Sequence, residues 1–172
     1  MGQVHVRRLQ EEDSFEEITD LLHRAYSVLA DLGLRYLATH QDSGVTKDRC
    51  LSGETYVGVF EGRIVSTVTL KAPGEADSGY YGKPGVASFG QFGVDLPFQR
   101  SGLGAGIMRL IEERAREMGA LELACDTAQP AKHLIQWYDS MGYRKVEEAD
   151  WRPTTNYKSW ILAKVLHLPT DR

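Results

Sequence analysis

The sequence predicts a single α/β domain over residues 1–172, with helices on both faces of a mixed, mostly antiparallel sheet of about six or seven strands. The first observation is the spacing of the apolar residues. In some segments they recur at every second position, as in a strand, and in others at every third or fourth position, as in a helix, and the two kinds of segment alternate along the chain. The second is a strand–helix–strand segment in mid-chain, which requires a parallel pair with a right-handed crossover, flanked by hairpins that require antiparallel pairs. The third is the length of 172 residues, which suits one domain with one core.

The first half of the chain is expected to form a strand, two helices and a hairpin. These elements are a strand over 3–9, a helix over 13–33, a short helix over 46–53, and strands over 54–60 and 63–70. In the first helix, Ser14 and Glu17 have the spacing of a capping box, and Gly33 stands where a helix-ending glycine belongs. The Glu-Gly pair at 61–62 predicts a tight turn between the two strands.

The second half begins with a loop over 71–85, which is rich in Gly and Pro. Its Tyr80 and Tyr81 either form a wall for a substrate or pack the loop onto the protein. The expected elements after it are a strand over 86–94, a helix over 103–118, a strand over 121–127, a helix over 131–141, and strands over 143–148 and 159–166. Two glycines within the strand over 86–94 indicate a bulge or a close approach of another part of the backbone.

Composition excludes several classes of protein. The net charge of −4 gives no basic face for general binding of nucleic acid. The two cysteines, Cys50 and Cys125, lie far apart, so we expect no disulfide framework, no metal site and a reducing compartment. The N-terminal residues carry no signal-peptide pattern and no apolar run reaches membrane-spanning length, so the sequence predicts a soluble, cytoplasmic protein without a membrane partner.

Three glycines, Gly102, Gly104 and Gly106, lie where the helix over 103–118 should begin. The first turn of a helix has N–H groups without intrahelical partners, and glycines there allow an anion such as a diphosphate to approach them closely. The run is neither a Walker loop, which needs GxxxxGK[ST], nor a dinucleotide fingerprint, because Ile107 replaces the third glycine of GxGxxG. A ligand that carries phosphate is therefore expected at this turn; the alternative is that the glycines only allow an ordinary turn.

Three motifs carry a resemblance to the GNAT superfamily of N-acetyltransferases over nearly the whole chain. They are QRSGLG at 99–104, matching [QR]-x-x-G-x-[GA]; the strand end FGV at 92–94, five residues before the glutamine; and YDSMGY at 138–143, matching Tyr-x-x-x-Gly-[FY]. The resemblance implies an acyl-CoA N-acyltransferase fold, acetyl-CoA as co-substrate, and transfer of an acetyl group to a primary amine by direct attack in a ternary complex. A small-molecule amine is the expected acceptor. A protein N-terminus or lysine, or a catalytically silent acyl-CoA-binding module, is the alternative.

The resemblance also assigns site residues. Those implied for binding of the co-substrate are Phe92, Gly93, Val94, Gln99, Arg100, Ser101, Gly102, Leu103, Gly104 and Ala105. In relatives the strand over 86–94 diverges from the strand over 121–127, and the gap admits the pantetheine arm. Tyr138 takes the position of the general acid that protonates the leaving thiolate, or else packs between helix and sheet. Asp126 is the candidate general base, acting directly or through a water, or else it caps a turn at the end of its strand.

Some features depart from the family pattern. The strand over 86–94 offers only Ser88 and Gln91 where some members carry a catalytic glutamate, and Ala131 or Lys132 stands where many carry a cofactor-binding asparagine. We expect His133 at the surface or behind the site, and Cys125 as a buried small residue. The acceptor is expected between the segments 15–53, 71–85 and 147–159. Relatives are commonly dimers, so a homodimer is one assembly that the resemblance allows.

Overall fold

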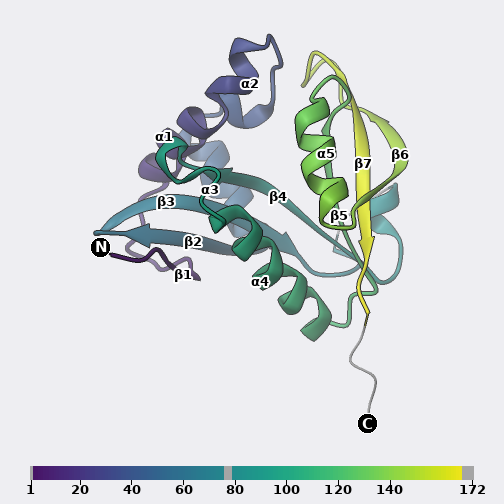
Figure 1. Ribbon diagram of the computed structural model, residues 1–172, viewed down its shortest axis with the longest axis horizontal. Coiled ribbons are helices and arrows are strands. Elements are labelled where there is room, and N and C mark those ends of the chain that lie inside the picture. Colours follow the sequence, from purple (N-terminus) through teal and green to yellow (C-terminus); the bar gives the residue numbers. More distant parts are fainter. Residues whose placement is uncertain (1, 76–78, 168–172) are drawn as a thin grey trace. The chain divides into compact units, whose positions relative to one another are not determined.

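The computed structural model describes residues 2–75 and 79–167 as a mixed α/β fold (Figure 1). The helices are α1 (Phe15–Ala25), α2 (Ser27–Asp31), α3 (Ser43–Leu51), α4 (Leu103–Glu117) and α5 (Lys132–Ser140), with short 3₁₀ turns η1 (Leu37–Thr39), η2 (Tyr80–Gly82) and η3 (Leu96–Phe98). The strands are β1 (His5–Arg8), β2 (Glu54–Phe60), β3 (Arg63–Lys71), β4 (Val86–Val94), β5 (Glu122–Ala128), β6 (Arg144–Asp150) and β7 (Lys158–Val165). They form a seven-stranded sheet in the order β1-β2-β3-β4-β5-β7-β6, which confirms the predicted fold class.

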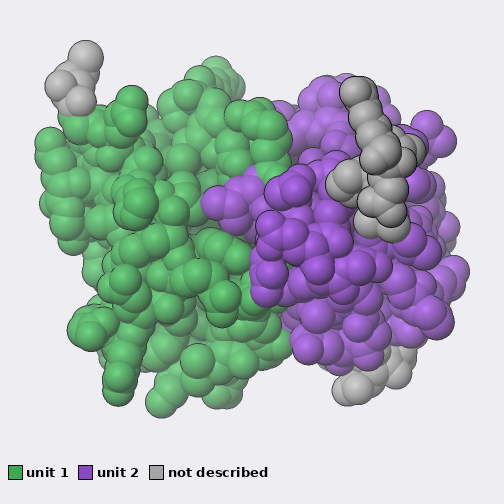
Figure 2. All heavy atoms as spheres, turned by 90° about the horizontal axis from the view of Figure 1, so that it is seen from below, with its two compact units in different colours: residues 1–70, 90–109 green, residues 71–89, 110–172 purple. Residues whose placement is uncertain are grey.

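The chain divides into two compact units (Figure 2). Unit 1 comprises residues 1–70 and 90–109, and unit 2 comprises residues 71–89 and 110–172. The division falls inside β4, between Phe89 and Gly90, and inside α4, between Arg109 and Leu110. A single domain over residues 1–172 stays a prediction.

Unit 1 is built on an antiparallel ladder of β1, β2 and β3. The predicted tight turn between β2 and β3 is confirmed, because Glu61 and Gly62 both have positive φ, 48° and 77°. Helices α1 and α3 pack on this ladder around a core of apolar side chains that includes Leu21, Cys50 and Val57. Burial of these side chains, each about 1.5–3 kcal/mol for a large aliphatic residue, is the main force that holds the helices to the sheet.

The single helix predicted over 13–33 is wrong: α1 ends at Ala25 and α2 begins at Ser27. The serine half of the predicted capping box is confirmed, because Ser14 Oγ accepts a hydrogen bond from the Glu17 N–H at 3.2 Å, whereas Glu17 Oε1 accepts one from the Ile64 N–H at 2.8 Å. The interruption has a local cause, since Ser27 Oγ donates to the Arg24 carbonyl at 2.7 Å and Tyr26 adopts φ −92° and ψ 2°. A serine that binds the backbone of its own helix competes with helix continuation.

Unit 2 contains the parallel pair that the strand–helix–strand pattern predicted. Residues 86–88 of β4 pair in parallel with residues 122–124 of β5, whereas β5, β7 and β6 pair antiparallel. The divergence of β4 from β5 beyond these residues stays a prediction. One cluster of buried side chains joins η2, β4, β5 and β7 through Tyr80, Val86, Ala124, Ile161 and Ala163.

Two kinds of feature are absent from the described residues: membrane-spanning helices and clusters of metal-binding side chains. Over 2–75 and 79–167, no helix is both long enough and apolar enough to cross a bilayer. Within the same ranges, no group of three or more His, Cys, Asp or Glu side chains is placed to hold a metal ion. Both cysteines are free and buried.

Candidate active site

The first turn of α4 contains main-chain N–H groups that lie outside the helical hydrogen-bond ladder, of which that of Leu103 donates to Ser101 Oγ at 3.4 Å. The first intrahelical bond runs from the Gly106 N–H to the Gly102 carbonyl at 3.0 Å, so the N–H groups of residues 103–105 precede the hydrogen-bonded ladder. Arg100 and Gly102 have left-handed backbones, with φ of 61° and 86°, and both are exposed. The first turn contains no acidic residue. This is the local chemistry that a diphosphate needs, because N–H dipoles converge there without a competing negative charge.

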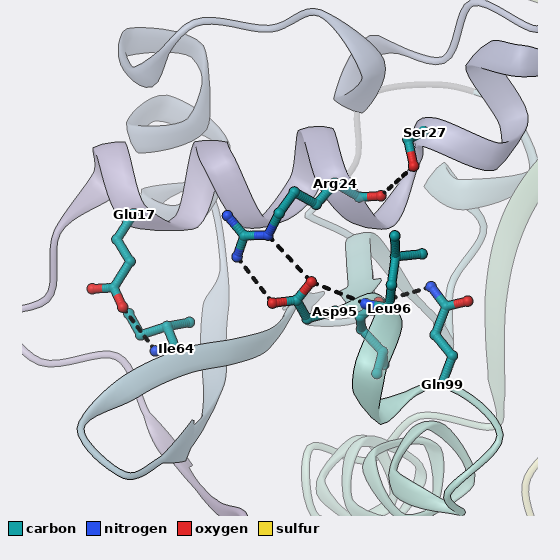
Figure 3. Close-up of polar contacts among 8 residues, drawn as sticks. Glu17, Arg24, Ser27, Ile64, Asp95, Leu96 and Gln99 are labelled. Carbon is teal, nitrogen blue, oxygen red and sulfur yellow. Dashed lines mark hydrogen bonds and ion pairs between the residues drawn. The ribbon is translucent and has the colours of Figure 1, made fainter.

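The turn that leads into α4 is fixed by its own side chains (Figure 3). Gln99 Nε2 donates to the Val94 carbonyl at 2.9 Å, and Ser101 Oγ donates to the Phe98 carbonyl. The side chain of Gln99, a predicted co-substrate residue, therefore binds the protein's own backbone. It shapes the turn that precedes these N–H groups.

An ion pair between Arg24 of α1 and Asp95, which was not predicted from the sequence, connects the same turn to α1. Arg24 Nε and Nη2 donate to Asp95 Oδ1 and Oδ2 at 3.2 and 3.0 Å, and Leu96 N–H donates to Oδ1 at 2.9 Å (Figure 3). The Asp95 side chain is only 10% exposed. Its hydrogen bonds raise the pKa of Arg24 above its ordinary value. The sequence did contain one signal for this contact: Asp95 stands immediately before a Leu-Pro pair, and an aspartate in that position often caps a turn.

The middle of β4 departs from regular strand geometry, as its two glycines predicted. Gln91 has a φ of 49°. A Cβ on Gly93 would lie 3.1 Å from Leu22 Cδ2 and 3.3 Å from Ala25 Cβ, so α1 is the element that approaches the strand closely. The Tyr26 hydroxyl donates a hydrogen bond to the Phe92 carbonyl at 2.7 Å, a contact that no sequence pattern indicated. The main chain of β4, the strand predicted to bind the co-substrate, is thus held by α1 and by Tyr26, the residue that follows α1.

In unit 2, Tyr138 lies in an aromatic cluster and is 8% exposed. Its ring centroid is 6.2 Å from that of Phe89, 5.0 Å from Trp137 and 5.7 Å from Tyr143. Burial raises the pKa of Cys125 well above its ordinary value, and a hydrogen bond with Tyr138 acts in the opposite direction. The ring of Tyr138 is therefore packed while its hydroxyl reaches β5. The prediction that Cys125 is a buried small residue is confirmed.

The two tyrosines of η2 bind two carboxylates of β5. Tyr81 Oη donates to Asp126 Oδ1 at 2.5 Å, and Tyr80 Oη donates to Glu122 Oε1 at 2.7 Å. Burial and Glu122 raise the pKa of Tyr80 to about 12, and burial and Asp126 raise the pKa of Tyr81 further. Both tyrosines pack their loop onto the buried cluster of unit 2, one of the two roles considered, and Tyr81 also reaches Asp126. Asp126 is exposed and lies within β5, opposite Ile161 of β7.

The structure places every predicted co-substrate residue in unit 1 and both predicted catalytic residues in unit 2. Of the alternatives on β4, Gln91 is 3% exposed and Ser88 is 8% exposed. At the start of α5, Ala131 is buried and Lys132 is exposed, and His133 lies at the surface as expected. The roles of Tyr138 and Asp126 stay predictions.

Comparison with known proteins identifies the family. The model of the acetyltransferase (GNAT) family matches residues 15–160. A Bacillus subtilis (strain 168) protein named S-(2-succino)cysteine N-acetyltransferase is 30% identical over 145 residues, which are 83% of this chain and 86% of that protein.

Solved structures agree on the fold. A GNAT family acetyltransferase from Elizabethkingia anophelis with acetyl-CoA bound superposes with a TM-score of 0.68 at 14% identity, covering 96% of this chain and all of that one. The Escherichia coli ribosomal-protein-S18-alanine N-acetyltransferase superposes with a TM-score of 0.73 at 12% identity, covering 99% and 98%. Because the family model spans most of the chain and the curated relative is an N-acetyltransferase, this protein belongs to the GNAT family and is an N-acetyltransferase.

Proposed function

We propose that this enzyme transfers the acetyl group of acetyl-CoA to the primary amine of a small carboxylated amino acid, and S-(2-succino)cysteine is the first candidate. The observation that carries the proposal is the start of α4. N–H groups ahead of the helical ladder, a left-handed glycine and the lack of an acidic residue in the first turn support binding of a diphosphate there. The name of the Bacillus subtilis relative supplies the acceptor to test first.

Within this proposal, the residues of unit 1 bind the co-substrate. When bound, acetyl-CoA supplies an activated acyl group and a thiolate that is able to leave. The N–H groups of residues 100–105 hold the diphosphate, and main chain at Phe92, Gly93 and Val94 pairs with the pantetheine arm. An N–H group of that strand stabilises the negative charge that develops on the carbonyl oxygen.

The residues of unit 2 move the protons. Asp126 takes a proton from the acceptor ammonium, directly or through a water, and Tyr138 gives its hydroxyl proton to the sulfur. One carbon–nitrogen bond forms as one carbon–sulfur bond breaks. The acylated nitrogen then gives up its second proton, which restores the Tyr138 hydroxyl, and the proton on Asp126 passes to solvent, so the step balances. The exposure of Asp126 and the reach of the Tyr138 hydroxyl to β5 support these roles.

The co-substrate part is tested by substituting Gly102. Gly102→Ala is expected to weaken acetyl-CoA binding by about tenfold, because alanine disfavours a φ of 86° and the turn would rearrange its N–H groups. Isothermal calorimetry with acetyl-CoA measures this. Gly62→Ala is the matched control, since Gly62 has a φ of 77° and open surroundings but lies in the β2–β3 turn. Equal affinities for Gly102→Ala and the wild type would contradict the proposed diphosphate site.

The acceptor is tested by thiol release with a panel of amines that includes S-(2-succino)cysteine, simple amines and peptides with free N-termini. Selective turnover of S-(2-succino)cysteine or a similar amino acid supports the proposal. Preferential turnover of peptides would replace it with protein acetylation.

The contact between Tyr81 and Asp126 gives a prediction for pH dependence. Tyr81→Phe removes a hydrogen bond that stabilises the ionised carboxylate, so the acidic limb of the kcat/KM profile is expected to move to higher pH. Tyr80→Phe is the matched control, because it removes the equivalent bond to Glu122 four residues away on the same strand. If both variants keep the wild-type acidic limb, Asp126 is not the base.

A further inference from the structure

One position of β4 differs from the rest of the strand in its exposure. Gly90 is exposed to solvent, whereas the other residues of β4 are buried or half-buried. Because Gly90 has no side chain, solvent reaches the main chain at this point. Arg49 of α3 lies beside it, with its Nη2 atom 3.6 Å from where a Cβ on Gly90 would be. A guanidinium group thus borders an accessible stretch of a central strand.

The guanidinium is held in place by a chain of hydrogen bonds. Arg49 Nη1 donates to Gln41 Oε1 at 2.7 Å, and Gln41 Nε2 donates to Gln91 Oε1 at 2.8 Å. Gln41 Nε2 also donates to Thr46 Oγ1 at 2.7 Å, and Gln91 Nε2 donates to Cys50 Sγ at 3.1 Å. Gln41 and Gln91 are 2% and 3% exposed. Since both amides are buried and bonded, they fix Arg49 relative to the irregular part of β4.

Packing of α3 onto the sheet does not require a network of buried polar side chains. Apolar side chains of the same size would fill the space without the desolvation cost of two buried amides. The network instead orients one cation beside Gly90, which is two residues before Phe92 in β4. Phe92 is the first residue of the proposed site for the pantetheine arm. A small carboxylated amine is long enough to span this separation.

We propose that Arg49 binds a carboxylate of the acceptor amine, over Gly90, and that this contact selects carboxylated amines as substrates. The inference rests on the proposed acetyl transfer and names the residue that recognises the acceptor. An arginine held at its Nη1 atom presents its planar fork to a carboxylate in a fixed orientation, which favours charge-assisted hydrogen bonds. Gly90 keeps the space above the strand open for the ligand.

The test combines a change in the protein with a change in the acceptor. We expect Arg49→Gln to lower kcat/KM for S-(2-succino)cysteine by about 10- to 100-fold, the usual loss for a hydrogen bond between charged partners. The same variant should lose much less with an acceptor from which the recognised carboxylate is missing. Two such analogues are S-(2-succino)cysteamine, without the α-carboxylate, and S-ethylcysteine, without the succinyl carboxylates. The analogue whose turnover is insensitive to the substitution identifies the carboxylate bound.

Controls separate recognition from folding. Arg63→Gln removes an exposed arginine at the start of β3 and should leave every acceptor unaffected. Arg49→Lys keeps the charge without the fork and should retain part of the selectivity. The acetyl-CoA affinity of Arg49→Gln should match that of the wild type. Urea denaturation should show that the variant stays folded under assay conditions, although the buried Gln41 oxygen loses its donor. Equal losses with all acceptors, or no loss with any, would overturn the inference.

A binding measurement keeps the inference distinct from the proposed function. Calorimetry should show that the wild type binds S-(2-succino)cysteine in the presence of coenzyme A, and that Arg49→Gln binds it at least about tenfold more weakly. If no amine is acetylated but this difference remains, the proposed transfer fails while the carboxylate site stands. If the wild type turns over amines and the difference is absent, the carboxylate site fails alone.

Discussion

Tyr138→Phe is expected to lower kcat by about 100- to 1,000-fold at saturating acetyl-CoA, within the range usual for the loss of a general acid. The phenylalanine ring can keep the contacts with Phe89, Trp137 and Tyr143, so the fold should persist. The variant loses only the hydroxyl, which in the wild type reaches β5 beside Cys125. Thiol release at saturating amine and acetyl-CoA measures kcat, and calorimetry checks that acetyl-CoA still binds.

The matched control is Tyr143→Phe, a change of the same kind in the same aromatic cluster. Tyr143 Oη donates to Glu112 Oε1 at 3.0 Å, and burial and Glu112 raise its pKa above the ordinary value for tyrosine. Its hydroxyl is therefore a structural donor, and its loss should lower stability with little effect on kcat. If Tyr138→Phe turns over at the wild-type rate, Tyr138 is a packing residue and the proton comes from elsewhere.

Lys164→Met is expected to lower the free energy of unfolding by about 3 kcal/mol, the lower end of the cost of leaving one partner of a buried ion pair alone. Glu112 of α4 is 7% exposed in its side chain, and Lys164 Nζ donates to its two oxygens at 3.2 and 3.1 Å. Without the lysine, only Tyr143 remains as a described donor to this carboxylate. The lower end applies because the Lys164 side chain is 26% exposed and solvent screens part of the interaction. Urea denaturation measures the loss.

Two further variants test whether the cost comes from the unpaired carboxylate. Lys164→Arg should retain most of the stability, because it keeps a cation within reach. The double variant Glu112→Leu with Lys164→Met should recover much of what Lys164→Met loses, since no buried charge is then left unpaired. A double variant as unstable as Lys164→Met would show that the loss is one of packing.

The elements that position the start of α4 could be predicted from the sequence because their signals are local. Glycine spacing, apolar periodicity and the Glu-Gly turn each depend on neighbouring residues, and the structure confirms the helix and hairpin they predicted. The break at Tyr26 could not be predicted in this way. The apolar spacing of three and four residues continues through it, and the competing bond from Ser27 to Arg24 leaves no trace in that pattern.

The contacts that shape the candidate site were beyond sequence reasoning for a different reason. Tyr26 with Phe92, Gln41 with Gln91, and Tyr81 with Asp126 join residues 66, 50 and 45 positions apart. Which polar groups meet over such separations depends on strand register and helix placement, and no single-sequence pattern specifies these. The three motifs predict where a co-substrate binds, whereas Arg49 and Tyr81 emerged only from the folded arrangement.

The polar chain behind Arg49 is composed of amides, hydroxyls and one thiol. Burial raises the pKa of that thiol, Cys50, so it stays neutral under ordinary assay conditions. Acidity of the buffer and ionic strength should therefore leave the orientation of the guanidinium untouched. Rate changes with pH would then originate in the reacting groups and in the ligand's own ionisation, and rate changes with ionic strength in the screening of charged contacts between protein and ligand.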